Sequence, residues 1–412
     1  MPSSAKPFSR RWRVSPVKPG FMALHPDQAF NYFMNRLAQT NEPGELIEVG
    51  RRISTVEDWT REMAAAAERA EADGRHLNAA HYWRATEFYT SPAAPGKAEA
   101  YERFLELHDR ALPEVAAMRT SVPFDGAHLP VIDVPPQGEH RGVIVMHSGF
   151  DGASEETYPS AAALAGAGYR VLLFDGPGQG SALRRSGLHM THDWERPVST
   201  LLDHFGIDEC TLIGVSLGGY LAPRAAAFEP RVARVVSWGA MYDFAACFRK
   251  RIGDASFEAL MTLVDQGARD ELNEVVDAAM AVNAEAAWAV NHGRHVSGSD
   301  DTFSYFQWLT TMNLREVSER IGQDMLIVMG TDDHLVPFGQ VHEQIAAATN
   351  ARSVTVRITT AAEQGAEHCQ VGNPMLVVDE ILRWLDGLRR RDEHLADCRP
   401  NLVSMVGVSN PR

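Results

Sequence analysis

The sequence predicts an α/β fold built on one mostly parallel sheet of eight strands. Two observations lead to this prediction: eight short β-type runs follow one another after residue 115, and helical segments separate most of them. The first two runs have no helix between them, which indicates a hairpin-like pair, whereas strands joined by helices run parallel. The expected strands are 119–124, 129–134, 142–146, 170–174, 211–213, 232–238, 325–329 and 353–358.

Two helical regions accompany the predicted sheet. Between residues 26 and 115 apolar residues recur at three- and four-residue steps, as in Phe30, Phe33, Met34 and Leu37, without a strand pattern. We therefore expect an N-terminal helical domain that serves as a cap. Residues 244–313 are also helical and too long for a simple crossover, which indicates a cap insertion. The sheet domain is then formed by 116–243 and 314–392, a disordered or extended tail by 1–25, and a C-terminal tail by 393–412.

The formal net charge of −15 argues against nucleic acid or an anionic membrane as a partner, because both would repel the chain. No stretch of 18 uncharged apolar residues is present, so no membrane span is expected. The four cysteines, none of which forms a C-x-x-C pair, suggest neither a zinc site nor a disulfide framework, and a reducing cytoplasm is the expected location. We expect no metal and no cofactor, and a homodimer is left open.

A candidate nucleophile is Ser216, in the string Gly-Val-Ser-Leu-Gly at 214–218. The string joins an apolar strand to a helical segment, and a serine on such a turn is lifted above the sheet edge. By itself the string is equally compatible with a structural turn. The next residue, Leu217, would offer its backbone N–H to an oxyanion.

A serine nucleophile needs a histidine base and usually a carboxylate that orients the histidine. The loop after the seventh strand contains Asp332 and Asp333, and we favour Asp333 because of its spacing to the Val-Pro at 336–337. The loop after the eighth strand contains His368, which we assign as the base. Carboxyl ends of parallel strands meet at one edge of a sheet, so these loops are expected to meet near Ser216.

Two glycine-containing loops complete the expected site. The loop after the third strand, at 147–152, is expected to supply a second oxyanion N–H from Phe150, although the assignment could fall one residue away or the glycines could simply make a turn. The string Asp-Gly-Pro-Gly-Gln-Gly at 175–180 lacks the placement of a dinucleotide-binding loop. It is expected to shape the floor beneath the nucleophile.

Together these strings and the Ser-Trp-Gly at 237–239 resemble one family of α/β-hydrolases. This family contains bacterial 2,6-dihydroxypseudooxynicotine hydrolase and fungal hydrolases that shorten polyketide chains during pigment synthesis. The order Ser216, Asp333, His368 is also the chain order of α/β-hydrolases. The resemblance implies the α/β-hydrolase fold, an N-terminal helical segment, and cofactor-free hydrolysis of a small carbonyl compound, at a carbon–carbon bond next to a ketone or at an ester.

One departure concerns an additional glutamate that the resemblance implies shortly after the Ser-Trp-Gly string. Residues 240–250 contain no glutamate, and Tyr242 and Asp243 are the proton-capable groups there. Either could contact substrate or donate a proton, as could His147, while Asp243 could instead cap a helix. The hypothesis is a serine-dependent hydrolase. The alternatives are an acyltransferase or cyclase with the same acyl-enzyme, and a non-catalytic ligand-binding protein on the hydrolase scaffold.

Overall fold

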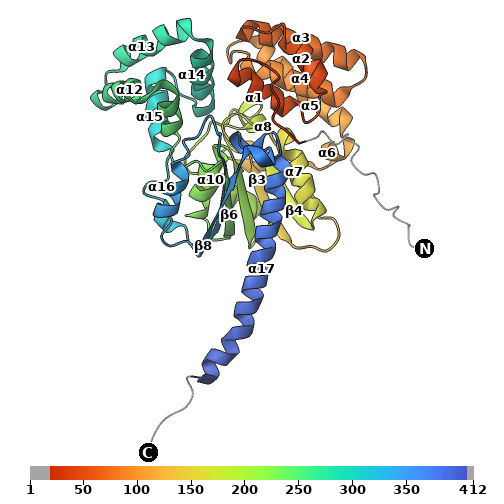
Figure 1. The fold of residues 1–412 in the computed structure, drawn as a ribbon, viewed down its shortest axis with the longest axis vertical. Helices are drawn as coiled ribbons and strands as arrows, with labels where there is room; N and C mark the ends of the chain where they lie inside the picture. Colours follow the sequence, from red (N-terminus) through yellow and green to blue (C-terminus); the bar gives the residue numbers. More distant parts are fainter. Residues whose placement is uncertain (1–18, 406–412) are drawn as a thin grey trace, which may run out of the picture. The chain divides into compact units, whose positions relative to one another are not determined.

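The computed structural model describes residues 19–405, and the chain divides after Ala116 into two compact units, whose elements are labelled in Figure 1. The parts of both predicted tails at 1–18 and 406–412 lie outside the described residues. None of the described helices is long and apolar enough to cross a membrane.

The described residues of the first unit form helices and connecting turns, without a strand. Its helices pack around buried aromatic side chains such as Phe33 and Trp59, and the Trp59 indole donates a hydrogen bond to the carbonyl of Ala85 over 2.8 Å. Helix α3 begins at a capping box between Thr55 and Asp58. The helices are α1 (Gln28–Leu37), α2 (Pro43–Gly50), α3 (Val56–Ala72), α4 (His76–Tyr89), α5 (Pro95–Ala111) and α6 (Pro113–Ala117).

Residues 22–25, which belong to the predicted N-terminal tail, have no helix or strand but are held against α1. Asn35 accepts a hydrogen bond from the Met22 N–H over 2.8 Å and donates one to the Met22 carbonyl, while Asn31 accepts from the N–H groups of Leu24 and His25. Leu24 is buried. Two asparagines of α1 therefore fix this segment through its backbone, an interaction that hydrophobic periodicity does not reveal.

The second unit contains one sheet of eight strands in the order β1-β2-β4-β3-β5-β6-β7-β8. β1 pairs antiparallel with β2, and β2 with β4, whereas all later pairs are parallel. The predicted eight-stranded, mostly parallel sheet is confirmed, with each boundary within two residues. The strands are β1 (Arg119–Phe124), β2 (Ala127–Val134), β3 (Gly142–His147), β4 (Tyr169–Phe174), β5 (Cys210–Val215), β6 (Val232–Trp238), β7 (Asp324–Gly330) and β8 (Ser353–Thr359).

Helices in two groups flank this sheet. α7 (Ser154–Gly166) and α17 (Pro374–Met405) contact each other, and α9 (Glu195–Phe205) contacts α10 (Gly218–Ala226), which lies along β5 and β6. The central strands are almost completely buried, because helices cover both faces of a parallel sheet. The shorter helices are α8 (Gly180–Arg184), α16 (Gln340–Ala347) and the 3₁₀ turns η1 (Ser318–Arg320), η2 (Ala361–Glu363) and η3 (His368–Gln370).

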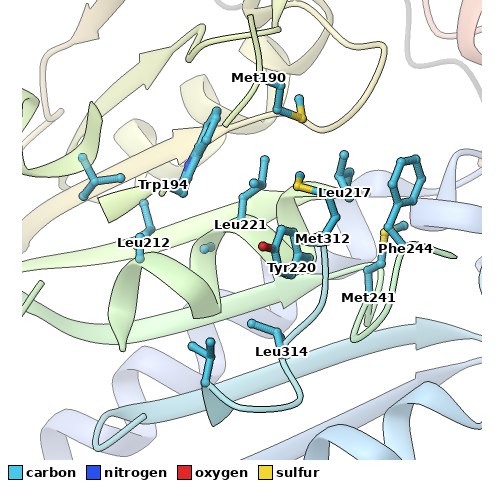
Figure 2. Packing of buried hydrophobic residues seen from close by; sticks show 14 of the residues in the cluster. Met190, Trp194, Leu212, Leu217, Tyr220, Leu221, Met241, Phe244, Met312 and Leu314 are labelled. Carbon is cyan, nitrogen blue, oxygen red and sulfur yellow. The ribbon is translucent and has the colours of Figure 1, made fainter. Parts of the chain in front are cut away.

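Between β6 and β7 lies a helical insertion, at the position where a cap was expected. It packs on loops that follow the carboxyl ends of strands: the Trp308 indole donates to the Met190 carbonyl over 3.2 Å, and the Phe244 ring packs at a tilt 5.1 Å from that of Phe150. Figure 2 shows Phe244 and Met312 from the two ends of this insertion near Leu217. Its helices are α11 (Ala245–Ile252), α12 (Asp254–Gln266), α13 (Arg269–Val282), α14 (Ala284–Ser297) and α15 (Thr302–Thr311).

The last helix is longer than the sequence pattern predicts. We expected the sheet domain to end at 392 and a tail to follow, but α17 continues to Met405. Beyond Leu388 its apolar pattern stops, and ion pairs hold it instead. Arg391 donates two hydrogen bonds of 2.7 Å to the buried carboxylate of Asp324 at the start of β7, and it also pairs with Asp392.

Candidate active site

Ser216 lies between the end of β5 and the start of α10, in a left-handed backbone conformation with φ of 63°. Such a conformation is uncommon for a residue other than glycine and is held here by hydrogen bonds of the Ser216 backbone to Trp238 and Gly219. A side chain on Gly214 would place its Cβ 1.9 Å from the Gly218 carbonyl oxygen. The strand can therefore turn this sharply into the helix only with glycine at 214.

The hydroxyl of Ser216 lies 2.8 Å from Nε2 of His368, and Nδ1 of His368 lies 2.6 Å from Oδ2 of Asp333. The other oxygen of Asp333 accepts hydrogen bonds from the backbone N–H groups of Leu335 and Val336. The carboxylate is thus fixed on both sides and fixes the imidazole in turn. The structure brings together the three residues that the sequence predicts, from loops after β5, β7 and β8.

Electrostatics favours an ionised carboxylate next to this histidine. Burial opposes charge on His368, but the neighbouring Asp333 carboxylate outweighs it and raises the pKa of His368 well above its usual value. Burial likewise opposes charge on Asp333. The charge of His368 and the hydrogen bonds that the carboxylate accepts outweigh burial, so the pKa of the Asp333 carboxyl lies below its usual value. Because Asp333 accepts at Nδ1, Nε2 is left to accept the proton of the Ser216 hydroxyl.

Asp332, the alternative acid, is exposed to solvent, whereas Asp333 is buried. The backbone N–H of Asp332 donates to the carbonyl of Ala366 over 2.8 Å and so joins the acid loop to the loop that carries His368. The geometry therefore favours Asp333 as the residue that orients the histidine.

The predicted oxyanion loop lies directly against the turn at Ser216. A Cβ on Gly149 would be 2.6 Å from the backbone nitrogen of Leu217, so the loop backbone and this N–H are immediate neighbours. Leu217 precedes the first residue of α10, where N–H groups lack partners within the helix. Phe150, the other predicted donor, follows Gly149 in the same loop and packs its ring 5.1 Å from that of Phe244.

The glycine-rich string at 175–180, which was expected to shape the floor of the site, supports the oxyanion loop through hydrogen bonds. The Gln179 amide donates hydrogen bonds to the carbonyls of Ser148 (2.6 Å) and Gly149 (3.1 Å). Asp175 accepts from the N–H groups of Ser154 and Ser181, at the starts of α7 and α8. Sequence reasoning missed the role of Gln179, although its position within the glycine string was the available signal.

His147 is completely buried and has both ring nitrogens engaged. The Trp194 indole donates to Nε2 over 3.1 Å, so Nδ1 carries the proton and donates to the Ser148 carbonyl over 2.9 Å. Burial lowers the pKa of His147 to about 4 and keeps the ring neutral. The structure thus places His147 as a support beneath the loop, and this burial argues against the contact with substrate that we considered from the sequence.

Asp243 and Tyr242 lie in the loop after β6. One oxygen of Asp243 accepts from the N–H of Ala245 at the start of α11, and the other is paired with Arg315. Tyr242 and Asp243 both donate their backbone N–H groups to the side chain of Gln340. Both residues are buried, and these contacts favour the capping interpretation of Asp243 over proton donation.

Two residues outside the predicted site residues also contact the site. Cys369 has a left-handed backbone with φ of 51°, and its Sγ lies 3.4 Å from Nε2 of His368, the nitrogen that faces Ser216. Lys250, at the end of α11, donates to the carbonyls of Asp333 (2.6 Å) and Val336 (3.1 Å). Within the described residues, no cluster of three His, Cys, Asp or Glu side chains has the arrangement of a metal site.

A serine on a strained strand-to-helix turn, with a carboxylate and a histidine from the two following strand ends, is the arrangement of an α/β-hydrolase. Residues 142–368, more than half of the chain, match the family model described as the alpha/beta hydrolase fold. The chain belongs to this family, and the predicted fold and the prediction of a hydrolase are confirmed.

Named relatives cover nearly the whole chain. Hydrolase LUC6 of a Fusarium species is 28% identical, over 89% of this chain and 99% of its own length. The 20-hydroxy-prefusarin hydrolase FUS2 of Gibberella moniliformis is also 28% identical, over 87% of this chain and 96% of its own length. The chain is thus similar to fungal hydrolases in both its helical region and its sheet domain.

Solved structures agree in fold over a comparable length. The crystal structure of 2,6-dihydroxy-pseudo-oxynicotine hydrolase covers 86% of this chain with a TM-score of 0.60 and 19% identity, and 94% of its own chain is matched. AbyA5 covers 88% with a TM-score of 0.64 and 19% identity, and 95% of its chain is matched. The family resemblance read from the sequence motifs is confirmed by these comparisons.

Proposed function

We propose that the chain is a serine-dependent hydrolase of a small carbonyl compound, with Ser216 as nucleophile, His368 as general base and Asp333 as the residue that orients it. One observation carries the proposal: the unbroken chain of contacts from the Ser216 hydroxyl through His368 to Asp333, at 2.8 and 2.6 Å. These distances are within the range that proton transfer requires.

In the proposed reaction Nε2 of His368 takes the hydroxyl proton while the Ser216 oxygen bonds to the substrate carbonyl carbon. The negative charge that develops on the carbonyl oxygen is received by the N–H groups of Leu217 and Phe150. Collapse of the adduct breaks the bond to the leaving group, which takes the proton from His368, and leaves an acyl-enzyme. Water then gives a proton to His368 and attacks the acyl carbon, and the acid departs as Ser216 regains its proton.

The leaving group is an alkoxide if the substrate is an ester, and an enolate if a carbon–carbon bond next to a ketone is cleaved. The family resemblance and the names of the relatives, a 20-hydroxy-prefusarin hydrolase and a pseudo-oxynicotine hydrolase, support a small organic molecule as substrate. We propose carbon–carbon cleavage or ester cleavage within that class, performed without a cofactor.

The test uses a fluorophosphonate probe, which labels activated serines, and a p-nitrophenyl ester, whose hydrolysis by the protein is measured above the spontaneous rate. The wild-type protein is expected to be labelled at Ser216, and Ser216→Ala to lose labelling and about four to six orders of magnitude of turnover with its fold intact. Circular dichroism checks the fold of the variant. Wild-type protein that resists the probe, or a Ser216→Ala variant with near-normal turnover, would refute the proposal.

A second measurement separates hydrolysis from acyl transfer once a substrate is turned over. In ¹⁸O-labelled water, hydrolysis places one labelled oxygen in the acid product, because water resolves the acyl-enzyme. A product without label would identify an acyltransferase or cyclase with the same acyl-enzyme instead.

A further inference from the structure

The oxyanion loop is held through its carbonyl oxygens. Three successive carbonyls each accept a hydrogen bond from a buried side chain: Gln179 donates to Ser148 and Gly149, and Nε2 of His292 donates to Phe150 over 3.1 Å. Gln179 is 1% exposed and His292 is 3% exposed. Because the donor side chains are buried, these bonds help to set the direction of the loop backbone.

The two side chains act on the two peptide planes that flank Phe150. In a trans peptide the C=O and the following N–H point in opposite directions. The bond from Gln179 to the Gly149 carbonyl therefore directs the N–H of Phe150, and the bond from His292 to the Phe150 carbonyl fixes the next plane. With both planes fixed, the backbone dihedrals of Phe150 are determined.

His292 is itself held by aromatic contacts. Its ring stacks on Trp288 with 5.1 Å between centroids and 6° between planes, and it meets the Phe150 ring edge-on at 4.9 Å. Since a carbonyl oxygen can only accept, Nε2 carries the proton in this contact. The ring thus approaches the Phe150 backbone in a fixed orientation.

Helix α14, which carries His292, is fixed at this point against α15. A Cβ on Gly293 would lie 2.2 Å from the ring of Tyr305, so the two helices are in close contact one residue after His292. Val296, four residues after His292, accepts a hydrogen bond at its carbonyl from the N–H of Met190 over 2.8 Å. The insertion therefore presents His292 to the oxyanion loop from a packed helix.

We propose that His292 is a positioning residue of the oxyanion hole: its hydrogen bond to the Phe150 carbonyl fixes the peptide plane after Phe150 and, together with the Gln179 bond that directs the Phe150 N–H, holds this N–H where the oxyanion develops. The inference rests on the proposed function. Gln179 belongs to the sheet domain, whereas His292 belongs to the insertion, so the oxyanion hole is complete only when α14 is packed in place. The insertion thereby takes part in transition-state stabilisation without touching the reacting atoms.

Two variants separate the hydrogen bond from the aromatic packing. His292→Phe keeps a ring between Trp288 and Phe150 but has no donor, while His292→Gln loses the ring and keeps an N–H near the position of Nε2. For His292→Phe we expect kcat on a p-nitrophenyl ester and the rate of fluorophosphonate labelling to fall by about 10- to 100-fold, because a displaced donor costs that much. KM should stay within about twofold, and His292→Gln should recover most of the loss.

His295→Gln, on the same helix one turn later, is the matched control and is expected to react at the wild-type rate. A His292→Phe variant that labels as fast as wild type overturns the inference, and so does an equal loss in both His292 variants or a loss in His292→Gln alone. These outcomes differ from failure of the proposed function, in which the wild-type protein itself would not be labelled at Ser216.

Discussion

The loops that follow β6 and β7 each place a buried aspartate just beyond a neighbouring strand. Asp333, after β7, accepts two backbone N–H groups with one oxygen and His368 with the other. Asp243, after β6, accepts one backbone N–H at the start of α11 and is paired with Arg315. Equivalent positions in the sheet thus give two different roles, and the partner of each carboxylate decides which role it has.

The insertion touches both loops but in different ways. Lys250 of α11 donates to two carbonyls of the β7 loop and leaves the Asp333 carboxylate to the histidine. In the β6 loop the insertion contacts the carboxylate itself, because the N–H of Ala245 at the start of α11 donates a hydrogen bond to Asp243. Both oxygens of the Asp243 carboxylate are thus engaged, one by the start of α11 and the other by Arg315.

Among changes to these two loops, the largest effect is expected from Asp333→Asn, which keeps the shape of the side chain and removes its charge. An amide can donate to Nδ1 and so favours the wrong tautomer of His368, and turnover should fall by about 10⁴-fold. Ester hydrolysis and fluorophosphonate labelling measure the loss. A decrease of less than tenfold would mean that Asp333 does not orient the base.

A smaller effect is expected on the pH dependence of kcat/KM. The base must be neutral, and the Asp333 charge raises the pKa of His368, so activity in the wild type appears only as pH rises through that raised value. In Asp333→Asn the burial that lowers this pKa remains while the opposing charge is gone. The acid limb of the residual activity should therefore move to lower pH, and a limb that stays in place would contradict the coupling between these two groups.

The smallest effect on activity is expected from Asp243→Asn, the matched control for the loop after β6. Its labelling rate should stay within about threefold of wild type and its pH profile should not move, because its carboxylate contacts Arg315 and a helix start. Loss of the charged partner should lower the free energy of unfolding by about 1–2 kcal/mol, as measured by urea denaturation. A loss of turnover comparable to that of Asp333→Asn would instead make Asp243 part of the reaction.

Much of this site could be predicted because its residues follow strands. Ser216, Asp333 and His368 each lie in the segment that follows a run with strand character, and parallel strands bring such segments to one edge. Gln179, Lys250 and His292 could not be identified in this way. They bind backbone carbonyls, which every residue has, so no pairing of side-chain types in the sequence points to these contacts.

The fold shows the same division between periodic and non-periodic signals. All eight strands were found from their composition, whereas the end of α17 was not, because beyond Leu388 an ion pair to Asp324 replaces apolar periodicity. Likewise the segment at Met22 to His25 is ordered by two asparagines that bond its backbone. Polar contacts between distant residues leave no repeat in the sequence.

The bond between Arg391 and Asp324 sets a limit on how far the polypeptide can be shortened from its C-terminal side. Asp324 is 1% exposed and begins the strand whose other end leads to Asp333. A chain cut after residue 397 keeps this bond, but a chain cut after Leu388 loses the cation that binds both oxygens of the buried carboxylate and leaves Arg352, at 3.5 Å, as the remaining cation, which costs about 3 kcal/mol. That is a large share of the net stability of a domain, so the shorter chain is expected to be recovered as insoluble protein.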